Sequence, residues 1–197
     1  MAEELTQNTE QNESDSEKTA KELKKTEKSL RNLRWFLLYL FVFLFVVWLL
    51  FFKIIGITHM PTGDMEPRMD AGDLLVFFRL DKKPAFREIV VFEKEPESDG
   101  KKKLLVGRVM AVPGDTVDIN DSNQLIINGN IINETSGLSS VTPKRGDRVQ
   151  YPLTLGEGQY FIVTDDREEG MDSRYFGPVS KKEILGTVIS MFRRNKL

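Results

Sequence analysis

Hydrophobic residues form one long uninterrupted run near the N-terminus, from Trp35 to Phe52. The run contains no charge, and a helix of this length spans roughly 27 Å, close to the thickness of the hydrocarbon core of a bilayer. Residues 54–57 extend it past Lys53. A cleavable signal peptide is the competing interpretation, but the following GITHMP lacks a small-residue cleavage pattern. We therefore predict a transmembrane helix over residues 35–57.

The residues before this helix divide into an acidic part and a basic part. Residues 1–17 carry six acidic residues, no basic residue and no aromatic residue, a composition that predicts disorder. Residues 18–34 carry seven Lys or Arg against two Glu. Basic residues that flank a membrane helix mark its cytoplasmic side. We therefore expect a single-pass protein of the cell membrane, with residues 1–34 in the cytoplasm and residues 58–197 outside the cell.

The rest of the chain alternates short segments rich in β-branched and aromatic residues with turns. The predicted strands cover residues 73–80, 87–93, 103–112, 124–129, 160–166 and 187–192. Asn128-Gly129 predicts a tight hairpin, and Gly72-Asp73 and residues 113–115 predict further turns. Residues 93–103 and 136–148 are predicted to be exposed, mobile loops. No long amphipathic helix follows the membrane segment, so the fold class is mainly β, an antiparallel β-sheet domain.

Composition excludes several kinds of function. The net charge of -2 provides no basic surface for nucleic acid. The chain has no cysteine, which rules out disulfides, thiol catalysis and Cys-ligated zinc. The only histidine, His59, is predicted to be a solvated surface residue beside the membrane. The acidic residues of the stretch 165–169 do not have the spacing of an EF-hand calcium loop. We expect neither a metal nor another cofactor.

Three short blocks carry the most specific pattern. The first is DMEPRM at residues 64–69, the second is GRVMAVPGD at residues 107–115, and the third is DDREEGMDSRYFG at residues 165–177. Their order, their spacing and their position after an N-terminal anchor resemble the type I signal peptidase family. The resemblance covers residues 35–197, and PGD and DSRYFG are its most specific parts. It implies the signal-peptidase type of β domain.

Members of that family use a Ser in S-M-x-P-T-L as nucleophile and a Lys in K-R-V-x-G-x-P-G-D as general base. A second Ser, in G-D-N-R-x-x-S-x-D-S-R, orients the Lys. Both partners are needed, because a hydroxyl is a weak nucleophile until a base takes its proton. The matching positions of this chain hold Asp64, Gly107 and Gly170. The resemblance therefore implies that the usual catalytic residues are absent, and Gly in place of Lys is expected to leave a cavity or a water-filled slot at Gly107.

Other residues of the blocks receive structural or binding roles from the same resemblance. A remnant of a peptide groove or oxyanion site is expected at Thr62, Asp64, Met65 and Pro67. The residues Arg167, Asp172, Ser173 and Arg174 are expected to hold a loop, with an ion pair between Asp172 and Arg174.

No simple replacement for the missing base is apparent. Lys103 lies roughly 13 Å from position 107 along a strand, and Arg108 stays protonated. Asp64 as a nucleophile would need an activated leaving group or a metal. A pair formed by Asp64 and Asp172 that shares one proton, as in aspartic proteases, stays open.

Within the signal peptidase family, the SipA-type proteins of Gram-positive pilus gene clusters also have Asp and Gly at the two catalytic positions. The resemblance implies a chaperone-like role in pilus assembly, with pilin subunits, a sortase or other exported proteins as partners beside the membrane. Two function classes remain open: a noncatalytic binding protein, and a signal peptidase that uses other residues. A third class, the self-cleaving repressors with Ser-Lys dyads, is disfavoured by the membrane anchor and by the missing dyad.

Overall fold

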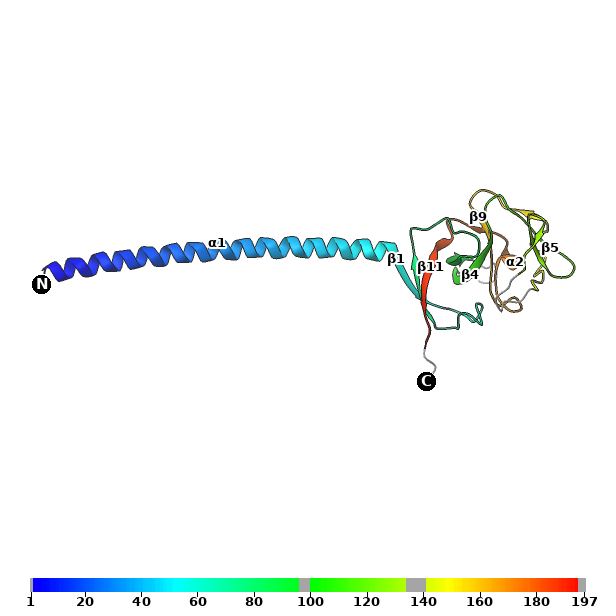
Figure 1. Ribbon diagram of the computed structural model, residues 1–197, viewed down its shortest axis with the longest axis horizontal. Coiled ribbons are helices and arrows are strands. Elements are labelled where there is room, and N and C mark those ends of the chain that lie inside the picture. Colours follow the sequence, from blue (N-terminus) through cyan, green and yellow to red (C-terminus); the bar gives the residue numbers. More distant parts are fainter. Residues whose placement is uncertain (1, 96–99, 134–140, 195–197) are drawn as a thin grey trace. The chain divides into compact units, whose positions relative to one another are not determined.

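The computed structural model describes residues 2–95, 100–133 and 141–194, with side chains from residue 25 onward. The chain forms two compact units, Met1–Phe51 and Phe52–Leu197. The first is helical and the second contains all the strands (Figure 1).

Helix α1 covers Ala2–Ile54, and its part Lys25–Ile54 is long and apolar enough to cross a membrane, with a mean hydropathy of 2.7. The prediction of disorder in residues 1–17 differs from the structure, which is helical from Ala2. The stretch contains five Glu and two Gln, residue types that favour a helix. A helix pairs its own backbone groups and needs no apolar core to do so.

The predicted extension of the helix over residues 55–57 is wrong. Residues Ile55–His59 form strand β1, which pairs antiparallel with β2, Leu74–Phe78. The β-branched residues of this segment favour a strand, and Gly56 lets the Phe77 ring approach, because a Cβ atom there would lie 2.2 Å from the ring. A run of hydrophobic residues looks the same whether it enters a bilayer or a sheet, which explains the error.

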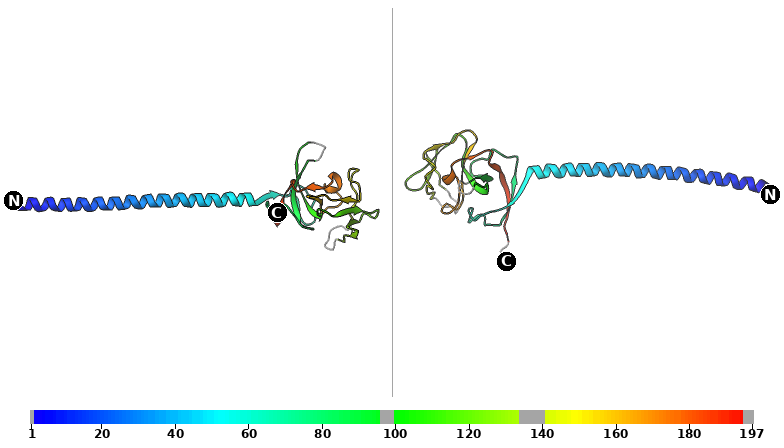
Figure 2. Two further views of the ribbon diagram at one scale, coloured as in Figure 1. Left: turned by 90° about the horizontal axis from the view of Figure 1, so that it is seen from above. Right: turned by 180° about the vertical axis from the view of Figure 1, so that it is seen from behind.

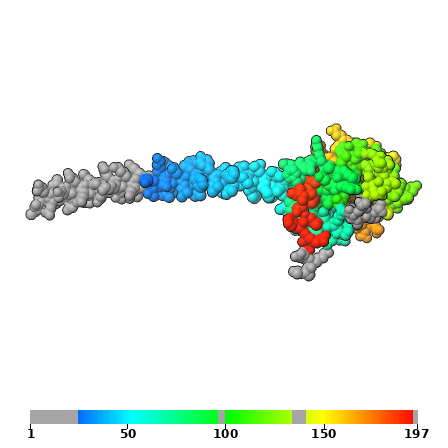
Figure 3. All heavy atoms as spheres, viewed as in Figure 1, coloured from blue at the N-terminus to red at the C-terminus, as the bar shows by residue number. Residues whose placement is uncertain are grey.

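The larger sheet has seven strands in the order β1-β2-β11-β3-β4-β9-β10, and every pairing is antiparallel. Its other strands are β3 (Ile89–Lys94), β4 (Lys103–Ala111), β9 (Gln159–Val163), β10 (Val179–Ser180) and β11 (Ile184–Phe192). The C-terminal strand β11 inserts between β2 and β3, and its last residues form an exposed strip on the face shown in Figure 3. All six predicted strands are confirmed, with shifted ends.

A smaller sheet has the order β7-β6-β5-β8. Its strands are β5 (Thr116–Ile119), β6 (Leu125–Ile127), β7 (Asn130–Ile131) and β8 (Leu153–Thr154). The predicted hairpin is present between β6 and β7, and Asn128 and Gly129 have φ angles of 52° and 80°, as a tight hairpin turn requires. This sheet and β1 lie at opposite ends of the domain (Figures 1 and 2). The prediction of a mainly antiparallel β domain is confirmed.

Side chains of β4 alternate between two apolar clusters of the domain. Leu105 and Val109 pack with Phe92 and Ile162, whereas Val106 packs on the other side with Met65. A third cluster joins the end of β4 to the smaller sheet. Neighbouring residues of β4 thus point into different parts of the core, because successive side chains of a strand point to opposite faces of the sheet.

The two predicted loops are only partly described. Residues 96–99 of one and 136–140 of the other lie outside the described residues. The prediction of an exposed loop is wrong at Thr142, which is buried and donates its backbone N–H to the Asn123 carbonyl. Arg145 also reaches inward, to the Arg167 carbonyl.

The hairpin turn yields a stability prediction. The Asn128 side chain accepts a hydrogen bond from the Thr116 N–H and donates one to Asp115, and its φ is positive. We expect Asn128→Ala to lower the free energy of unfolding by about 1–2 kcal/mol, measured by thermal or denaturant unfolding in detergent. The neighbouring Asn130→Ala is the control and should change it by less than about 0.5 kcal/mol. Equal effects of the two variants would contradict this role of Asn128.

Candidate functional site

The first block lies in the loop between β1 and β2, which folds back over the sheet. Its ends are joined by a hydrogen bond from the Met60 N–H to the Asp73 carbonyl. Met65 and Met69 are buried in the apolar cluster beneath the loop, while Asp64 is half-buried at its surface. The methionines thus anchor the loop and leave the Asp64 carboxyl beside the third block.

Three contacts join this loop to the third block. The Asp166 N–H donates to the Asp64 carbonyl at 2.9 Å, and the Asp165 N–H lies 3.4 Å from the Met65 sulfur. The Asp64 carboxyl also accepts a hydrogen bond from the Met171 N–H. The structure therefore brings the first and third blocks together, as their joint resemblance implies.

The pKa of the Asp64 carboxyl is raised above its ordinary value. Burial is the largest cause, and the negative charges of Asp166 and Asp172 add to the rise. Hydrogen bonds from the Thr62 hydroxyl and the Met171 N–H oppose it. The surroundings of Asp64 are thus acidic, and no Lys or His is among the groups that shift its pKa.

Two ion pairs hold the third block in place. Asp172 and Arg174 are fully buried and form a bidentate pair, with Arg174 Nε and Nη2 at 2.8 and 2.7 Å from the carboxylate oxygens. Asp165 forms a second bidentate pair with Arg108 of β4, at 2.9 and 2.6 Å. The Arg108–Asp165 pair was not predicted, because the two residues are distant in sequence and neither the strand pattern nor the family motifs indicate it.

The Asp172 carboxylate accepts five hydrogen bonds. Besides the two from the Arg174 guanidinium, it accepts them from the Arg174 N–H, the Thr164 N–H and the Thr164 hydroxyl. A carboxylate has about four lone-pair sites, so this one is saturated with donors. A pair that shares one proton between Asp64 and Asp172 is not supported by this arrangement.

Position 107 has no room for a side chain. Gly107 is buried in β4, and a Cβ atom there would lie 2.6 Å from Ile162 Cγ2 and 3.6 Å from the Phe92 ring. The expectation of a cavity at Gly107 is therefore wrong, because Ile162 of β9 fills the space. A side chain at 107 would also enter the cluster of Phe92 and Ile162, on the opposite face of β4 from Met65.

Position 170 is closed in a similar way. A Cβ atom on Gly170 would lie 2.0 Å from Thr164 Oγ1 and 2.6 Å from the Asp166 carbonyl oxygen. The Thr164 hydroxyl occupies this space, where its single hydrogen is shared between the Asp166 carbonyl at 2.9 Å and the Asp172 carboxylate at 2.8 Å. The sequence interpretation did not select Thr164, although it stands at the first position of the third family motif.

The other site residues predicted from the sequence have structural contacts. The Thr62 hydroxyl bonds the Asp64 carboxyl within its own loop, and Pro67 is exposed. The buried Ser173 hydroxyl accepts the Ile162 N–H at 3.0 Å, and the carbonyl of buried Arg167 accepts a hydrogen bond from Arg174 at 2.7 Å.

The residues considered as a replacement base lie elsewhere. Lys103 is exposed at the start of β4, paired in register with Lys94 of β3. His59 is exposed at the end of β1, as predicted. Neither is among the groups that affect the Asp64 carboxyl.

The family model described as "Signal peptidase, peptidase S26" matches residues 32–192. The chain belongs to this signal peptidase family. In the family motif G-D-N-R-x-x-S-x-D-S-R, Gly stands where this chain has Thr164 and Ser where it has Gly170. The larger of the two residues therefore stands at the first of these positions in this chain and at the second in the motif.

Several relatives have names that state an activity. Signal peptidase I V of Bacillus subtilis is 31% identical over 147 residues, which cover 70% of this chain and 82% of that protein. Probable signal peptidase I-2 of Synechocystis is 26% identical over 139 residues, 68% of this chain and 61% of that protein. A crystal structure of a signal peptidase I from Enterococcus faecalis has 28% identity and a TM-score of 0.42, and the match covers 54% of this chain and 97% of that one.

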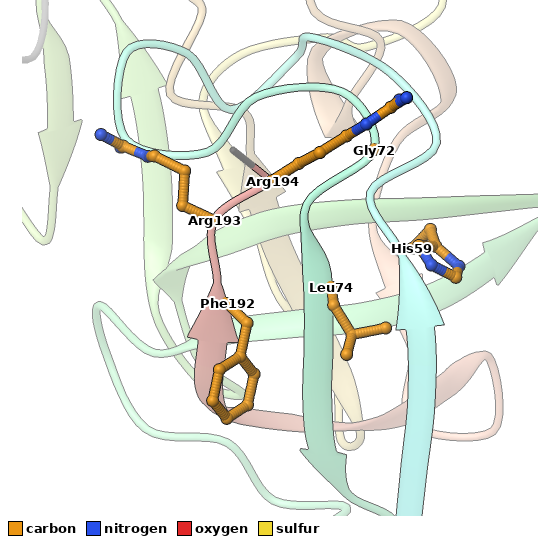
Figure 4. Close-up of a pocket in the computed structure, with 6 residues that line it drawn as sticks. All are labelled: His59, Gly72, Leu74, Phe192, Arg193 and Arg194. Carbon is orange, nitrogen blue, oxygen red and sulfur yellow. The ribbon is translucent and has the colours of Figure 1, made fainter. Parts of the chain in front are cut away.

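A surface pocket of about 440 Å³ lies away from these positions, at the ends of β1, β2 and β11 (Figure 4). Its lining residues are His59, Gly72, Leu74, Phe192, Arg193 and Arg194. Leu74 and Phe192 are paired across the strands, and Figure 4 shows the two arginines pointing in different directions. The pocket contains none of the residues of the three blocks.

The closed position 107 yields a stability prediction. We expect Gly107→Lys to lower the free energy of unfolding by about 3 kcal/mol or more, because it overpacks the core and buries a charge. The cost should be smaller in an Ile162→Ala background, measured as a double-mutant cycle by denaturant unfolding. Ile131→Lys, at an exposed strand position, is the control and should have little effect. If Gly107→Lys alone lowered the free energy of unfolding by much less than expected, the conclusion that position 107 has no room for a side chain would be wrong.

The raised pKa of Asp64 yields a pH prediction. The pKa of the Asp64 carboxyl in the folded state lies above its ordinary value of 3.8, so the protonated carboxyl stabilises the fold. This stabilisation is complete below pH 3.8 and is lost as the pH rises through the folded-state pKa. At pH 7, Asp64→Asn should therefore raise the free energy of unfolding, by less than about 1 kcal/mol because solvent screens a half-exposed group.

The gain should vanish as the pH falls toward about 4, measured by unfolding at several pH values. The exposed Asp147→Asn is the control for removal of a surface carboxylate and should change the free energy of unfolding at pH 7 by less than about 0.5 kcal/mol. A loss of stability in Asp64→Asn at pH 7 would mean that the hydrogen bonds to the carboxylate outweigh its burial.

Proposed function

We propose that this chain is a noncatalytic member of the signal peptidase family that binds exported proteins. The observation that carries the proposal is the pair of closed positions, where Ile162 fills the space beside Gly107 and Thr164 fills the space beside Gly170. A base at 107 and a hydroxyl at 170 would need these neighbours to move. Asp64 at the nucleophile position has Thr62, a backbone N–H and two acids around it, and none of these activates a nucleophile.

The proposed site of binding is the outer domain of a membrane-anchored protein. Helix α1 is long and apolar enough to cross a membrane, and the basic residues before it favour a cytoplasmic N-terminus. The domain would then meet exported chains as they leave the membrane. Pilin subunits, a sortase or other exported proteins are the proposed partners, and assembly of sortase-linked pili is the proposed process. This part rests on the resemblance of Asp64 and Gly107 to the SipA-type branch.

An active signal peptidase is the second candidate, and the names of the relatives favour it. The Bacillus subtilis and Synechocystis proteins are named signal peptidases, and the chain spans 82% and 61% of their lengths. Such an activity would have to use residues other than a Ser-Lys pair at positions 64 and 107.

The two candidates predict different results in a cleavage assay. Purified full-length protein in detergent is incubated with a precursor that carries a signal peptide, and the Bacillus subtilis signal peptidase I V serves as positive control. We expect less than about one thousandth of the control rate, since loss of a nucleophile or base costs several orders of magnitude. Cleavage that disappears in Asp64→Ala would refute the noncatalytic proposal.

The proposed process is tested in cells. Deletion of the gene in its own bacterium should reduce polymerised pili, and a copy with Asp64→Ala should restore them. Photo-crosslinking from the outer domain should capture pilin or sortase. Normal pili in the deletion strain would refute the role in pilus assembly without bearing on whether the protein is an enzyme.

A further inference from the structure

The loop between β2 and β3, residues 79–88, begins at the residue where α1 ends. The Arg79 N–H donates to the Ile54 carbonyl at 2.8 Å, and Arg79 Nε donates to the Ile55 carbonyl at 3.4 Å. Ile54 is the last residue of α1 and belongs to the same compact unit as the strands. If α1 crosses a membrane, these bonds place the loop at the membrane surface.

The loop presents apolar side chains to the surface. Leu80 is 62% exposed and Phe86 is 43% exposed, although both are large hydrophobic residues. The Arg87 guanidinium lies 5.2 Å from the centre of the Phe86 ring. Lys83 and Arg87 are exposed beside them. Apolar side chains between basic ones are typical of segments that lie at a lipid headgroup layer.

The basic side chains of the loop have no acidic partner. Within the described parts of the chain, Arg79, Lys83 and Arg87 form no ion pair. The two acids of the loop bind its own backbone instead: Asp81 accepts the Lys83 N–H, and Glu88 accepts the Ala85 N–H. The positive charges are therefore available to an external anion.

The loop is held in shape by the sheet. Lys82 Nζ donates to the carbonyls of Ile184 and Leu185 in β11, and the Thr187 hydroxyl donates to Asp81. The Arg87 N–H donates to the Val109 carbonyl at 2.7 Å. Since the exposed side chains stand on a preformed loop, contact with a surface would cost little ordering of the backbone.

We propose that loop 79–88 is a contact surface for anionic phospholipid headgroups of the membrane in which α1 is anchored. Leu80 and Phe86 enter the interfacial layer, and Arg79, Lys83 and Arg87 meet the phosphates. The inference rests on the proposed membrane anchorage. Its consequence is a second attachment of the outer domain, which fixes the orientation of the domain toward the bilayer.

The absence of cysteine allows a direct test with single-Cys variants of the full chain. Leu80→Cys and Phe86→Cys carry an environment-sensitive fluorophore, in vesicles of equal parts phosphatidylcholine and phosphatidylglycerol with a lipid-linked quencher. Val46→Cys in α1 is the positive control, and Ile131→Cys, 48% exposed in β7, is the matched surface control. We expect quenching at positions 80 and 86 to be at least about twofold stronger than at 131.

The lipid and charge dependence completes the test. Vesicles of phosphatidylcholine alone, and the pair Lys83→Glu with Arg87→Glu, should each reduce quenching at position 80 to the level at 131. The double variant Lys181→Glu with Lys182→Glu, at two exposed positions, is the charge control and should leave quenching at position 80 unchanged. Quenching at 46 but not at 80 and 86 would overturn the contact surface. Equal quenching in both lipids would overturn the recognition of anionic headgroups, and no quenching at 46 would overturn the anchorage together with the inference.

Discussion

The structure around the three blocks depends on one buried carboxylate. Asp172 is fully buried and receives five hydrogen bonds, from Arg174 in the short helix α2 (Ser173–Phe176) that it caps and from Thr164 after β9. Removing one member of such a pair costs about 3–5 kcal/mol, because the other charge stays buried without its partner. The bonds fix the loop that supplies the Asp166 N–H to Asp64. The position of Asp64 therefore follows from a contact in which it takes no part.

The same region shows how a core packs closely around glycine. Protein interiors are close-packed, so a missing side chain leaves either a void or a neighbour that has moved in. Here the neighbours are Ile162 beside Gly107 and Thr164 beside Gly170. Glycine at both positions is thus required by the packing, and the surface near Asp64 is set by backbone contacts and acidic groups.

The sequence predicts most strands of the larger sheet, but few of the side-chain contacts between segments that are distant in the chain. The larger strands were predicted because they are rich in β-branched and aromatic residues, and the Asn128-Gly129 turn has a direct conformational cause. Strand β1 was missed because a bilayer and a sheet select the same residues at 55–57. The filled space at Gly107 and the pair of Arg108 with Asp165 arise from contacts between distant segments, which no local pattern records.

The steric link between Thr164 and Gly170 has a consequence for which residues position 170 can hold. The first carbon of any side chain at 170 would lie 2.0 Å from Thr164 Oγ1, so a larger residue at 170 alone would pack poorly. A similar barrier stands between Gly107 and any larger residue. A larger side chain at either glycine therefore needs a second change at its neighbour, so no single substitution can place the family's residue there without disturbing the core.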